Sequence, residues 1–465
     1  MKPPRRRAAI VTLGCSRNET DSEELAGRLS SAGWDVATEV DRADIVLVNT
    51  CGFITAAKQE SINTILAVAD EDARRPVVAV GCMAERYGRE LASQLPEAQA
   101  VLGFDQYVEI GAVLDRIIAG DAVASHEPID RRTLLPVVPV DRPGHLMSAP
   151  GHAGHRLRLG NGPVAPLKIA SGCDRRCAFC AIPLFRGSLI SRTVAEITAE
   201  AQWLLDQGVR ELYLVSENST SYGKDLPAAD LPTLLGALDV VAAQQETKRE
   251  QPIRIRASYL QPAEMRLDTI DAIAGLDHVA SYFDLSFQHA HEKLLRAMRR
   301  FGSADTFLAL IEKIRASAPQ AGIRTNFIVG FPGESEAALQ ELVDFIAAAR
   351  FDAVGVFGYS DEEGTAAHAL PDKLPADEVR RRVDWVCDVV DDVCAARAAD
   401  RIGETVKVLL ESVADDSAAR GWAAHQGPED GEIQVRIAAP ASVGSTLSAR
   451  VEAANGVDLL AVEES

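Results

Sequence analysis

The sequence has no long apolar run, no excess of positive charge and few cysteines for its length. No hydrophobic stretch reaches the ~18–20 residues that a membrane-spanning helix requires. The apolar run at residues 8–11, which follows a basic start, is too short for the core of a signal peptide. We therefore expect a cytoplasmic protein with no membrane segment.

The acidic net charge indicates which class of partner the protein binds. The formal net charge is −20, and acidic surfaces repel nucleic-acid phosphates and attract basic partners. Bulk charge leaves room for a local basic groove, so it disfavours a nucleic-acid substrate without excluding one. Eight cysteines in a chain of 465 residues also argue against a scaffold held together by disulfides.

The length suggests about three domains, and the pattern changes twice along the chain. Residues 8–120 alternate short apolar strands with helical stretches, which predicts a parallel sheet covered by helices. Residues 121–165 are rich in Pro, Gly and His and are typical of a linker. Three linker histidines could bind metal, but polar histidines without ligands are far commoner in such segments; they are His145, His152 and His155.

The strand–helix alternation resumes over residues 166–400. Six strand–helix units fall short of the eight in a closed barrel, so we expect a partial, open (βα)6 barrel. A long helix closes this region, and it carries two cysteines that we expect to face the core, Cys387 and Cys394. Residues 401–465 alternate apolar and polar positions with period two, which predicts a small β-barrel. The overall class is α/β.

Three cysteines stand close together after the first strand of the central region. Cys173, Cys177 and Cys180 have the spacing Cys-x-x-x-Cys-x-x-Cys. Iron–sulfur cubanes bind cysteine thiolates, usually four, so three ligands would leave one iron free to chelate S-adenosylmethionine (SAM). A structural zinc site is the alternative, but zinc requires four closed ligands and the loop has no fourth Cys or His.

Three more cysteines fall at matching places in the N-terminal region. Cys15, Cys51 and Cys82 each follow a predicted strand. Ligands of open parallel sheets collect beyond the carboxyl ends of the strands, so the three thiols can meet at one edge. Three inert buried cysteines are the alternative, because free cysteine is commonly buried. Their shared position favours a second cluster.

These motifs resemble a known family. With Phe179 before the last cysteine, the central loop has the signature of the radical SAM superfamily. The segments around the other cysteines resemble the N-terminal signature of methylthiotransferases, and the order of domains, ending in a TRAM barrel, covers nearly the whole chain. The ribosomal-protein branch of that family is favoured by the segments 21–23, 51–54, 57–61 and 357–365.

The resemblance implies an activity and its cofactors. It implies two 4Fe–4S clusters, the first on Cys15, Cys51 and Cys82 and the second, catalytic one on the central triplet, together with SAM. The implied reaction adds a methylthio group to the β-carbon of a conserved aspartate in small-subunit ribosomal protein twelve. An electron donor and a sulfur source, both unidentified, are further implied partners.

Four other residues are candidate contacts of the cofactor, namely Phe179, Glu217, Gln288 and Gly330. Gly330 could equally serve a tight turn, and Gln288 could form a satisfied core pair with His289. Residues 217–220, Glu-Asn-Ser-Thr, also depart from the Gln-Asp-Thr-Thr more usual in the family.

Two other functions compete with this hypothesis. A tRNA methylthiotransferase should have a basic terminal barrel, whereas residues 401–465 contain five basic and eleven acidic residues, a net charge of −6. An acidic barrel suits a basic ribosomal protein, and we expect it to dock through Glu429, Asp430 and Glu432. A non-catalytic iron–sulfur sensor would produce no 5′-deoxyadenosine from SAM under reduction.

Overall fold

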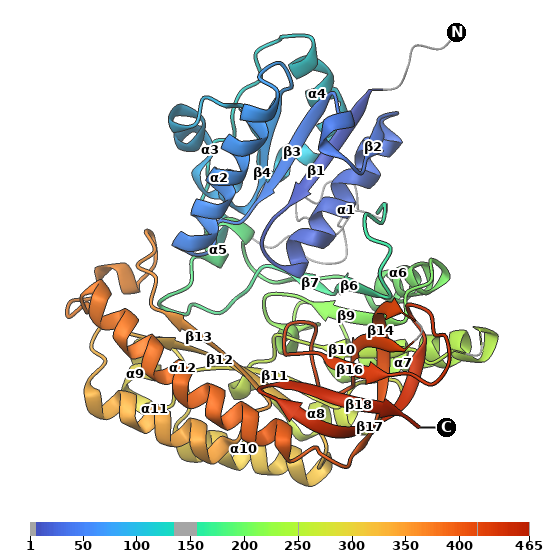
Figure 1. Ribbon diagram of the computed structural model, residues 1–465. Helices are drawn as coiled ribbons and strands as arrows, with labels where there is room; N and C mark the ends of the chain where they lie inside the picture. Colours follow the sequence, from blue (N-terminus) through green and yellow to red (C-terminus); the bar gives the residue numbers. More distant parts are fainter. Residues whose placement is uncertain (1–5, 134–155, 250, 416, 465) are drawn as a thin grey trace.

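The computed structural model describes residues 6–133, 156–249, 251–415 and 417–464. Figure 1 shows an α/β domain above a larger strand–helix domain, with a small β-barrel beside the latter. No helix in these ranges is both long enough and apolar enough to cross a membrane. The linker histidines at 145, 152 and 155 lie outside the described residues.

The N-terminal domain is a five-stranded parallel sheet in the order β2-β1-β3-β4-β5. Along β3, Ile45 and Leu47 enter one apolar cluster and Val46 and Val48 the other, so both faces are buried. Helices α1 and α4 cover the first face, and α2 and α3 cover the second. The elements are β1 (Arg7–Thr12), α1 (Ser16–Ser31), β2 (Asp35–Ala37), η1 (Val40–Arg42), β3 (Ile45–Thr50), α2 (Thr55–Glu71), β4 (Val77–Gly81), α3 (Cys82–Gln94), β5 (Ala98–Val101), η2 (Phe104–Glu109) and α4 (Ile110–Ile118).

The described parts of the linker bind back onto both neighbouring domains. After α4 the chain forms η3 (Arg131–Thr133), where Arg131 pairs with Asp105 at 2.8 Å. Further on, Arg156 pairs with Glu23 and, at 2.8 Å, with Glu200 of the central domain. The two domains are therefore joined by ion pairs as well as by chain continuity.

The central domain has six parallel strands, as the sequence predicts. They form two three-stranded sheets, β10-β9-β6 and β11-β12-β13, which isolated parallel bridges such as Leu260–Leu285 connect. No pairing within the described residues joins β13 to β6, so the partial barrel stays open. The strands are β6 (Val164–Lys168), β9 (Glu211–Val215), β10 (Arg254–Ala257), β11 (Tyr282–Gln288), β12 (Gly322–Val329) and β13 (Ala353–Gly358).

Helices surround these strands, and α12 packs beside β13 at the open edge. A short hairpin of β7 (Ala170–Ser171) and β8 (Ile190–Ser191) encloses the cysteine loop. The remaining elements are α5 (Ile182–Arg186), α6 (Val194–Asp206), η5 (Ser219–Ser221), α7 (Leu231–Arg249), η6 (Pro262–Glu264), α8 (Leu267–Gly275), α9 (Glu292–Ala297), α10 (Ala304–Ser317), α11 (Glu336–Ala349), η7 (Ala367–Ala369) and α12 (Ala376–Ala399).

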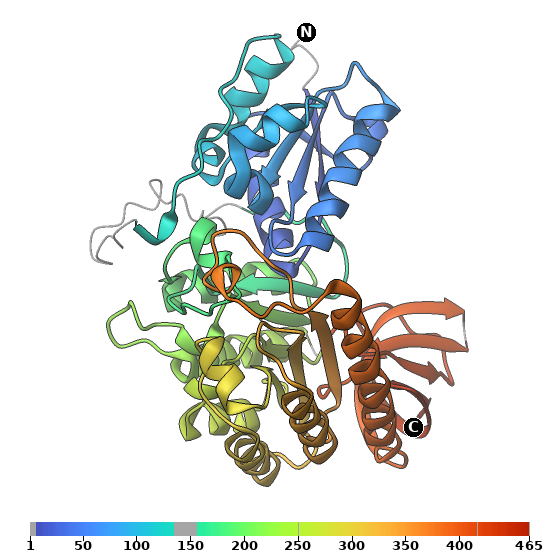
Figure 2. The ribbon, with the colours of Figure 1, turned by 90° about the vertical axis from the view of Figure 1, so that its left-hand side faces the viewer.

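The C-terminal part is a closed barrel in the order β14-β15-β16-β18-β17. Alternate residues such as Val408 and Leu410 fill its interior. Figure 2 shows the barrel beside helix α12. Its strands are β14 (Thr405–Asp415), β15 (Ala418–Trp422), β16 (Ile433–Arg436), β17 (Thr446–Asn455) and β18 (Asp458–Glu463).

Buried polar contacts attach the barrel to the central domain. Glu211 of β9 accepts hydrogen bonds from Arg256 at 2.6 Å and from the indole of Trp422 at 3.1 Å. Asp430 accepts from the Tyr282 hydroxyl and, at 2.8 Å, from Arg324. This corrects the expectation that Asp430 presents charge to a partner, because the residue is only 8% exposed and its carboxylate is occupied within the protein.

Candidate active site between two domains

The central cysteine loop is anchored on several sides. Gly172, at φ +78°, begins the loop, and a Cβ there would lie 2.1 Å from the Ser188 carbonyl oxygen, so only glycine fits. The Cys173 amide donates to the Gly187 carbonyl at 3.0 Å. Arg175, within the loop, pairs with Glu264 at 2.6 Å. These contacts present Cys173, Cys177 and Cys180 to one cavity.

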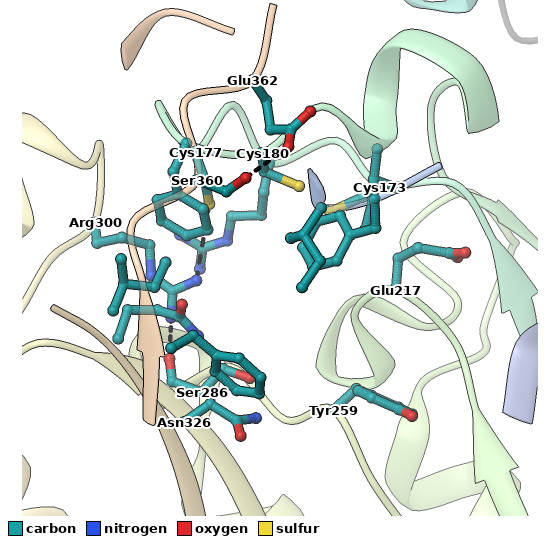
Figure 3. A pocket seen from close by; sticks show the side chains of 18 of the residues that line it. Cys173, Cys177, Cys180, Glu217, Tyr259, Ser286, Arg300, Asn326, Ser360 and Glu362 are labelled. Atoms are coloured by element: carbon teal, nitrogen blue, oxygen red, sulfur yellow. Dashed lines mark hydrogen bonds between the residues drawn. The ribbon is translucent and has the colours of Figure 1, made fainter. Parts of the chain in front are cut away.

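That cavity has a volume of about 320 Å³ and lies at the carboxyl ends of the central strands. Figure 3 shows the three cysteines along the upper side of it, Tyr259, Ser286 and Asn326 along the lower side, and Glu217 at the right. The N-terminal domain contributes Arg17, Phe53 and Ile54 to the same wall. The cavity is therefore enclosed by two domains, as ligand sites of α/β proteins commonly are.

Two polar groups in the cavity wall accept no hydrogen bond from the protein, although Glu217 forms an ion pair with Arg186 at 3.6 Å. Both carboxylate oxygens of Glu217 and the Oδ1 atom of Asn326 are buried without a hydrogen bond. A buried acceptor without a donor costs about 1–3 kcal/mol, so such groups indicate a missing ligand. SAM carries an ammonium and a sulfonium, which a carboxylate stabilises. The residues present thus fit SAM.

The thiols also fit a cluster better than a single metal ion. Among the described residues, no three His, Cys, Asp or Glu side chains converge as ligands of one ion. In a cubane each thiolate binds a different iron, so the thiolates need not meet at one point. Burial raises the pKa of the Cys173 thiol to about 12, and binding of iron by such a thiol therefore releases a proton.

The other three cysteines lie at the carboxyl edge of the N-terminal sheet. Cys15 is the N-cap of α1, Cys51 follows β3, and Cys82 is the first residue of α3. The strands β1, β3 and β4 are neighbours, and the strand order reverses between β1 and β3, where ligands of such sheets bind. A Cβ on Gly14 would lie 3.3 Å from Cys51 Sγ, so the chain ends are tightly packed here.

The N-terminal triplet differs from an inert core by its charge environment. Two helix N-termini point at it, and such termini stabilise thiolates. Burial opposes ionisation of Cys15, but the nearby charges of Arg17 and Arg186 outweigh it and lower the pKa of this thiol. Cys82 is different, because burial raises its pKa to about 12.

Two arginines, one from each domain, contact the opposite domain across the interface. Arg186 of the central domain donates to Cys82 Sγ at 3.1 Å and pairs with Asp21 at 2.7 Å. Lys168 also pairs with Asp21. Burial opposes ionisation of Asp21, but the two cations outweigh it and lower its pKa. In the other direction, Arg17 donates to the Ser216 carbonyl of the central domain at 3.2 Å.

A third interdomain contact surrounds Glu362, which is buried beside the cavity. It pairs with Lys58 at 2.7 Å and with Arg86 at 2.8 Å, both from the N-terminal domain. Arg86 also donates to the carbonyl of Gly52, next to Cys51, at 2.9 Å. This network fixes the segment that carries Cys51 over the cavity.

Three of the four remaining cofactor candidates line the cavity. Phe179, Glu217 and Gln288 line the cavity, and Gln288 has a left-handed backbone at φ +72°. Gly330 does not line it. Gly330 adopts φ +81° in a turn, where a Cβ would lie 2.7 Å from the Val379 side chain. Glu429 and Glu432 lie on the barrel, where the Glu429 side chain is 78% exposed.

Sequence reasoning assigned no role to several cavity residues. They are Arg17, Phe53, Ile54, Tyr259, Ser286, Arg300 and Asn326. Arg17 belongs to the Cys15 motif, so proximity to a candidate ligand was an available signal. Tyr259 had none, because its left-handed φ of +60° appears only in the fold.

Comparison with known proteins agrees with this architecture. Sequence profiles match residues 7–103 (Uncharacterized protein family UPF0004), 167–346 (Radical SAM superfamily) and 402–462 (TRAM domain). A protein of Saccharopolyspora erythraea named ribosomal protein uS12 methylthiotransferase RimO is 55% identical over 98% of this chain and 94% of its own. The chain belongs to the RimO family.

A second relative and a solved structure extend the comparison. A RimO protein of Kineococcus radiotolerans with the same name is 53% identical over 98% of this chain and 97% of its own. The solved radical SAM methyltransferase TsrM of Kitasatospora setae, with cobalamin and a [4Fe-4S] cluster bound, has a TM-score of 0.52 at 14% identity. It covers 76% of this chain and 75% of its own length, and this similarity shows the fold.

Proposed function

We propose that this RimO-family protein adds a methylthio group to the β-carbon of a conserved aspartate in ribosomal protein uS12. The observation that carries the proposal is the joint construction of one cavity. The central cysteine triplet lines it, and the N-terminal domain, which carries the other triplet, closes it through Arg17, Phe53 and Ile54. The N-terminal cysteines themselves do not line the cavity. Radical generation and sulfur donation need both centres close to one substrate carbon.

Each group of residues has a defined task in this proposal. The central triplet holds the catalytic 4Fe–4S cluster, and Cys15, Cys51 and Cys82 hold the other. Bound SAM supplies, after one-electron reduction, the carbon radical that removes hydrogen from the aspartate. Glu217 and Asn326 orient SAM through oxygens that accept no hydrogen bond within the protein. The apolar side chains of Phe53, Ile54 and Phe357 limit water in the cavity.

The barrel suits a basic protein better than RNA. Its net charge of −6 favours uS12, since ribosomal proteins are basic, and disfavours tRNA. We propose Glu429 and Glu432 as its docking residues, with Asp430 removed from the set. The proposal places the protein in the cytoplasm, with an unidentified electron donor and sulfur source as further partners.

Mass spectrometry of ribosomal proteins tests the proposal directly. Cells that contain the gene should carry one methylthio group on the uS12 aspartate, and cells without it should carry none. Complementation with the wild-type gene should restore the group, whereas a gene encoding Cys173→Ala should not. Unmodified uS12 in all strains, with a methylthio nucleoside lost from tRNA in the deletion strain, would favour the tRNA alternative. A protein that never forms 5′-deoxyadenosine would be a sensor.

A further inference from the structure

Arg17 occupies an unusual place between the two cysteine triplets. Its Nε atom donates to Cys15 Sγ at 3.4 Å, and its Nη1 atom donates to the Ser216 carbonyl of the central domain at 3.2 Å. The guanidinium lies 4.7 Å from the centre of the Tyr259 ring and lines the cavity. One side chain therefore contacts a candidate ligand of the first cluster, the central domain and the cavity.

The central domain holds the partners of Arg17 rigidly. Tyr259 has a left-handed backbone, which is costly for a residue with a side chain. Its amide donates to Asp284 at 2.8 Å, and its carbonyl accepts from the Ser219 amide at 3.1 Å. These bonds fix the backbone of Tyr259, and its ring lies against the guanidinium in the geometry of a cation–π contact.

Arg17 has no carboxylate within ion-pair distance, although the charge of Glu217 in the same cavity acts on it. Among the ion pairs of the described residues, Arg186 has Asp21 at 2.7 Å, but none includes Arg17. The charges of both arginines act on Cys15, but Arg17 is the one that donates a hydrogen bond to the Cys15 sulfur and lines the cavity. A nearby cation and a hydrogen bond to a ligand sulfur both raise the reduction potential of an iron–sulfur cluster.

We propose that Arg17 is a positioning residue for sulfur transfer that also sets the potential of the first cluster. Anchored on Ser216 and Tyr259, it fixes Cys15 relative to the central domain and stabilises the additional negative charge of the reduced cluster. This inference rests on the proposed function for its sulfur-transfer part and on the geometry alone for its redox part.

A redox titration tests whether the charge of Arg17 sets the potential of the first cluster. In the full-length chain with Cys173, Cys177 and Cys180 replaced by alanine, only the first cluster is expected to remain. Arg17→Gln should shift its midpoint potential, followed by electron paramagnetic resonance, to lower values. Arg17→Lys keeps the charge and should stay near the parent. Arg28→Gln is the matched control, because Arg28 lies on the same helix but pairs with Glu24. Equal potentials in the parent and Arg17→Gln would overturn the redox role.

The ratio of the two reaction products tests whether Arg17 is a positioning residue for sulfur transfer. With all six cysteines present, Arg17→Lys and Arg17→Gln should both raise the ratio of 5′-deoxyadenosine to methylthiolated product several-fold, since lysine cannot reproduce the planar contacts. An unchanged ratio in both variants would overturn the positioning role. If wild-type protein forms no methylthiolated uS12, the proposed function fails, whereas the redox titration still decides the role of the Arg17 charge.

Discussion

Arg186 of the central domain donates a hydrogen bond to Cys82 of the N-terminal domain, with 3.1 Å between Nη2 and Sγ. The same guanidinium pairs with buried Asp21 of that domain. The N-terminal cysteine site is therefore completed by a residue from the next domain, and neither domain forms it alone.

Loss of Arg186 should destabilise the protein. Arg186→Met keeps side-chain bulk but leaves Asp21 paired only with Lys168 in a buried site. We expect a loss of roughly 3 kcal/mol in the free energy of unfolding, at the lower end for a broken buried pair. Urea unfolding of the metal-free protein measures it. Arg296→Gln breaks an exposed pair with Glu292 on a helix surface and should cost about 0.3–0.5 kcal/mol; similar losses in the two variants would contradict this interpretation.

Loss of the central triplet should remove one cluster and the radical chemistry. Anaerobic wild-type protein should carry about eight irons, and the Cys173, Cys177 and Cys180 triple alanine variant about four. That variant should form no 5′-deoxyadenosine. Iron analysis and chromatography of the reaction mixture measure both results. Full iron in the variant, or zinc in the wild type, would show that these thiols have another role.

Loss of the N-terminal triplet should separate the two halves of the reaction. With Cys15, Cys51 and Cys82 replaced by alanine, the central cluster keeps all its ligands. We expect the variant to cleave SAM but to attach no sulfur to uS12, because the sulfur-donating centre is lost. Product analysis by mass spectrometry checks this. Ordinary methylthio product from the variant would identify these cysteines as core residues.

Ionisation of Glu264 should make the free energy of unfolding depend on pH in the acid range. Burial opposes its ionisation, but hydrogen bonds from Ser221 and Lys224 and the charge of Arg175 lower its pKa to about 2. A lowered pKa contributes stability that is present above the unfolded pKa and lost as pH falls through the folded one. Glu264 should thus supply about 3 kcal/mol near neutral pH, lost between about pH 4.5 and 2.

Replacement of Glu264 by glutamine should flatten this dependence. Urea unfolding of the metal-free wild type and Glu264→Gln should converge as pH falls from about 6 to 3. Glu292→Gln is the control, because Glu292 forms an exposed pair on a helix surface. A constant difference between wild type and Glu264→Gln across this range would show that ionisation of Glu264 adds no stability.

Reversal of two barrel charges should weaken substrate binding. Glu429→Lys with Glu432→Lys should lower the affinity for isolated uS12 roughly 2- to 30-fold, since each exposed pair contributes ~0.2–1 kcal/mol. Added salt should weaken wild-type binding and narrow the difference. Glu411→Lys with Glu452→Lys changes the net charge equally at other sites on the barrel. Equal weakening in both double variants, measured by calorimetry, would mean that docking follows total charge.

Local sequence patterns predicted the main strands and helices and the order of the domains, but not the contacts between the domains. Strands such as β3 and β12 have apolar residues bounded by turn signals, and they appear where the sequence places them. Two edge strands, β2 (Asp35–Ala37) and β5 (Ala98–Val101), were missed because they are too short to show a period. The start of helix α1 at Ser16 could not be predicted, since its first turn has no apolar residue to reveal it.

Contacts between distant residues were out of reach of the sequence. The three N-terminal cysteines could be placed at one edge because a strand end is a local feature. Asp430 was placed wrongly, since its partner Arg324 lies on a strand 106 residues earlier. The stacking of Arg17 on Tyr259 likewise depends on how two domains meet, which no local pattern records.

The ion pairs of Asp21 can form only after a much later part of the chain has been synthesised. Lys168 follows Asp21 by 147 residues and Arg186 follows it by 165. At a synthesis rate of about 5–20 residues per second, roughly 10–30 s pass before both cations emerge. During that interval the nascent N-terminal sheet holds a carboxylate without its counter-ions. Its cysteine pocket is therefore completed last, by side chains translated after the sheet itself.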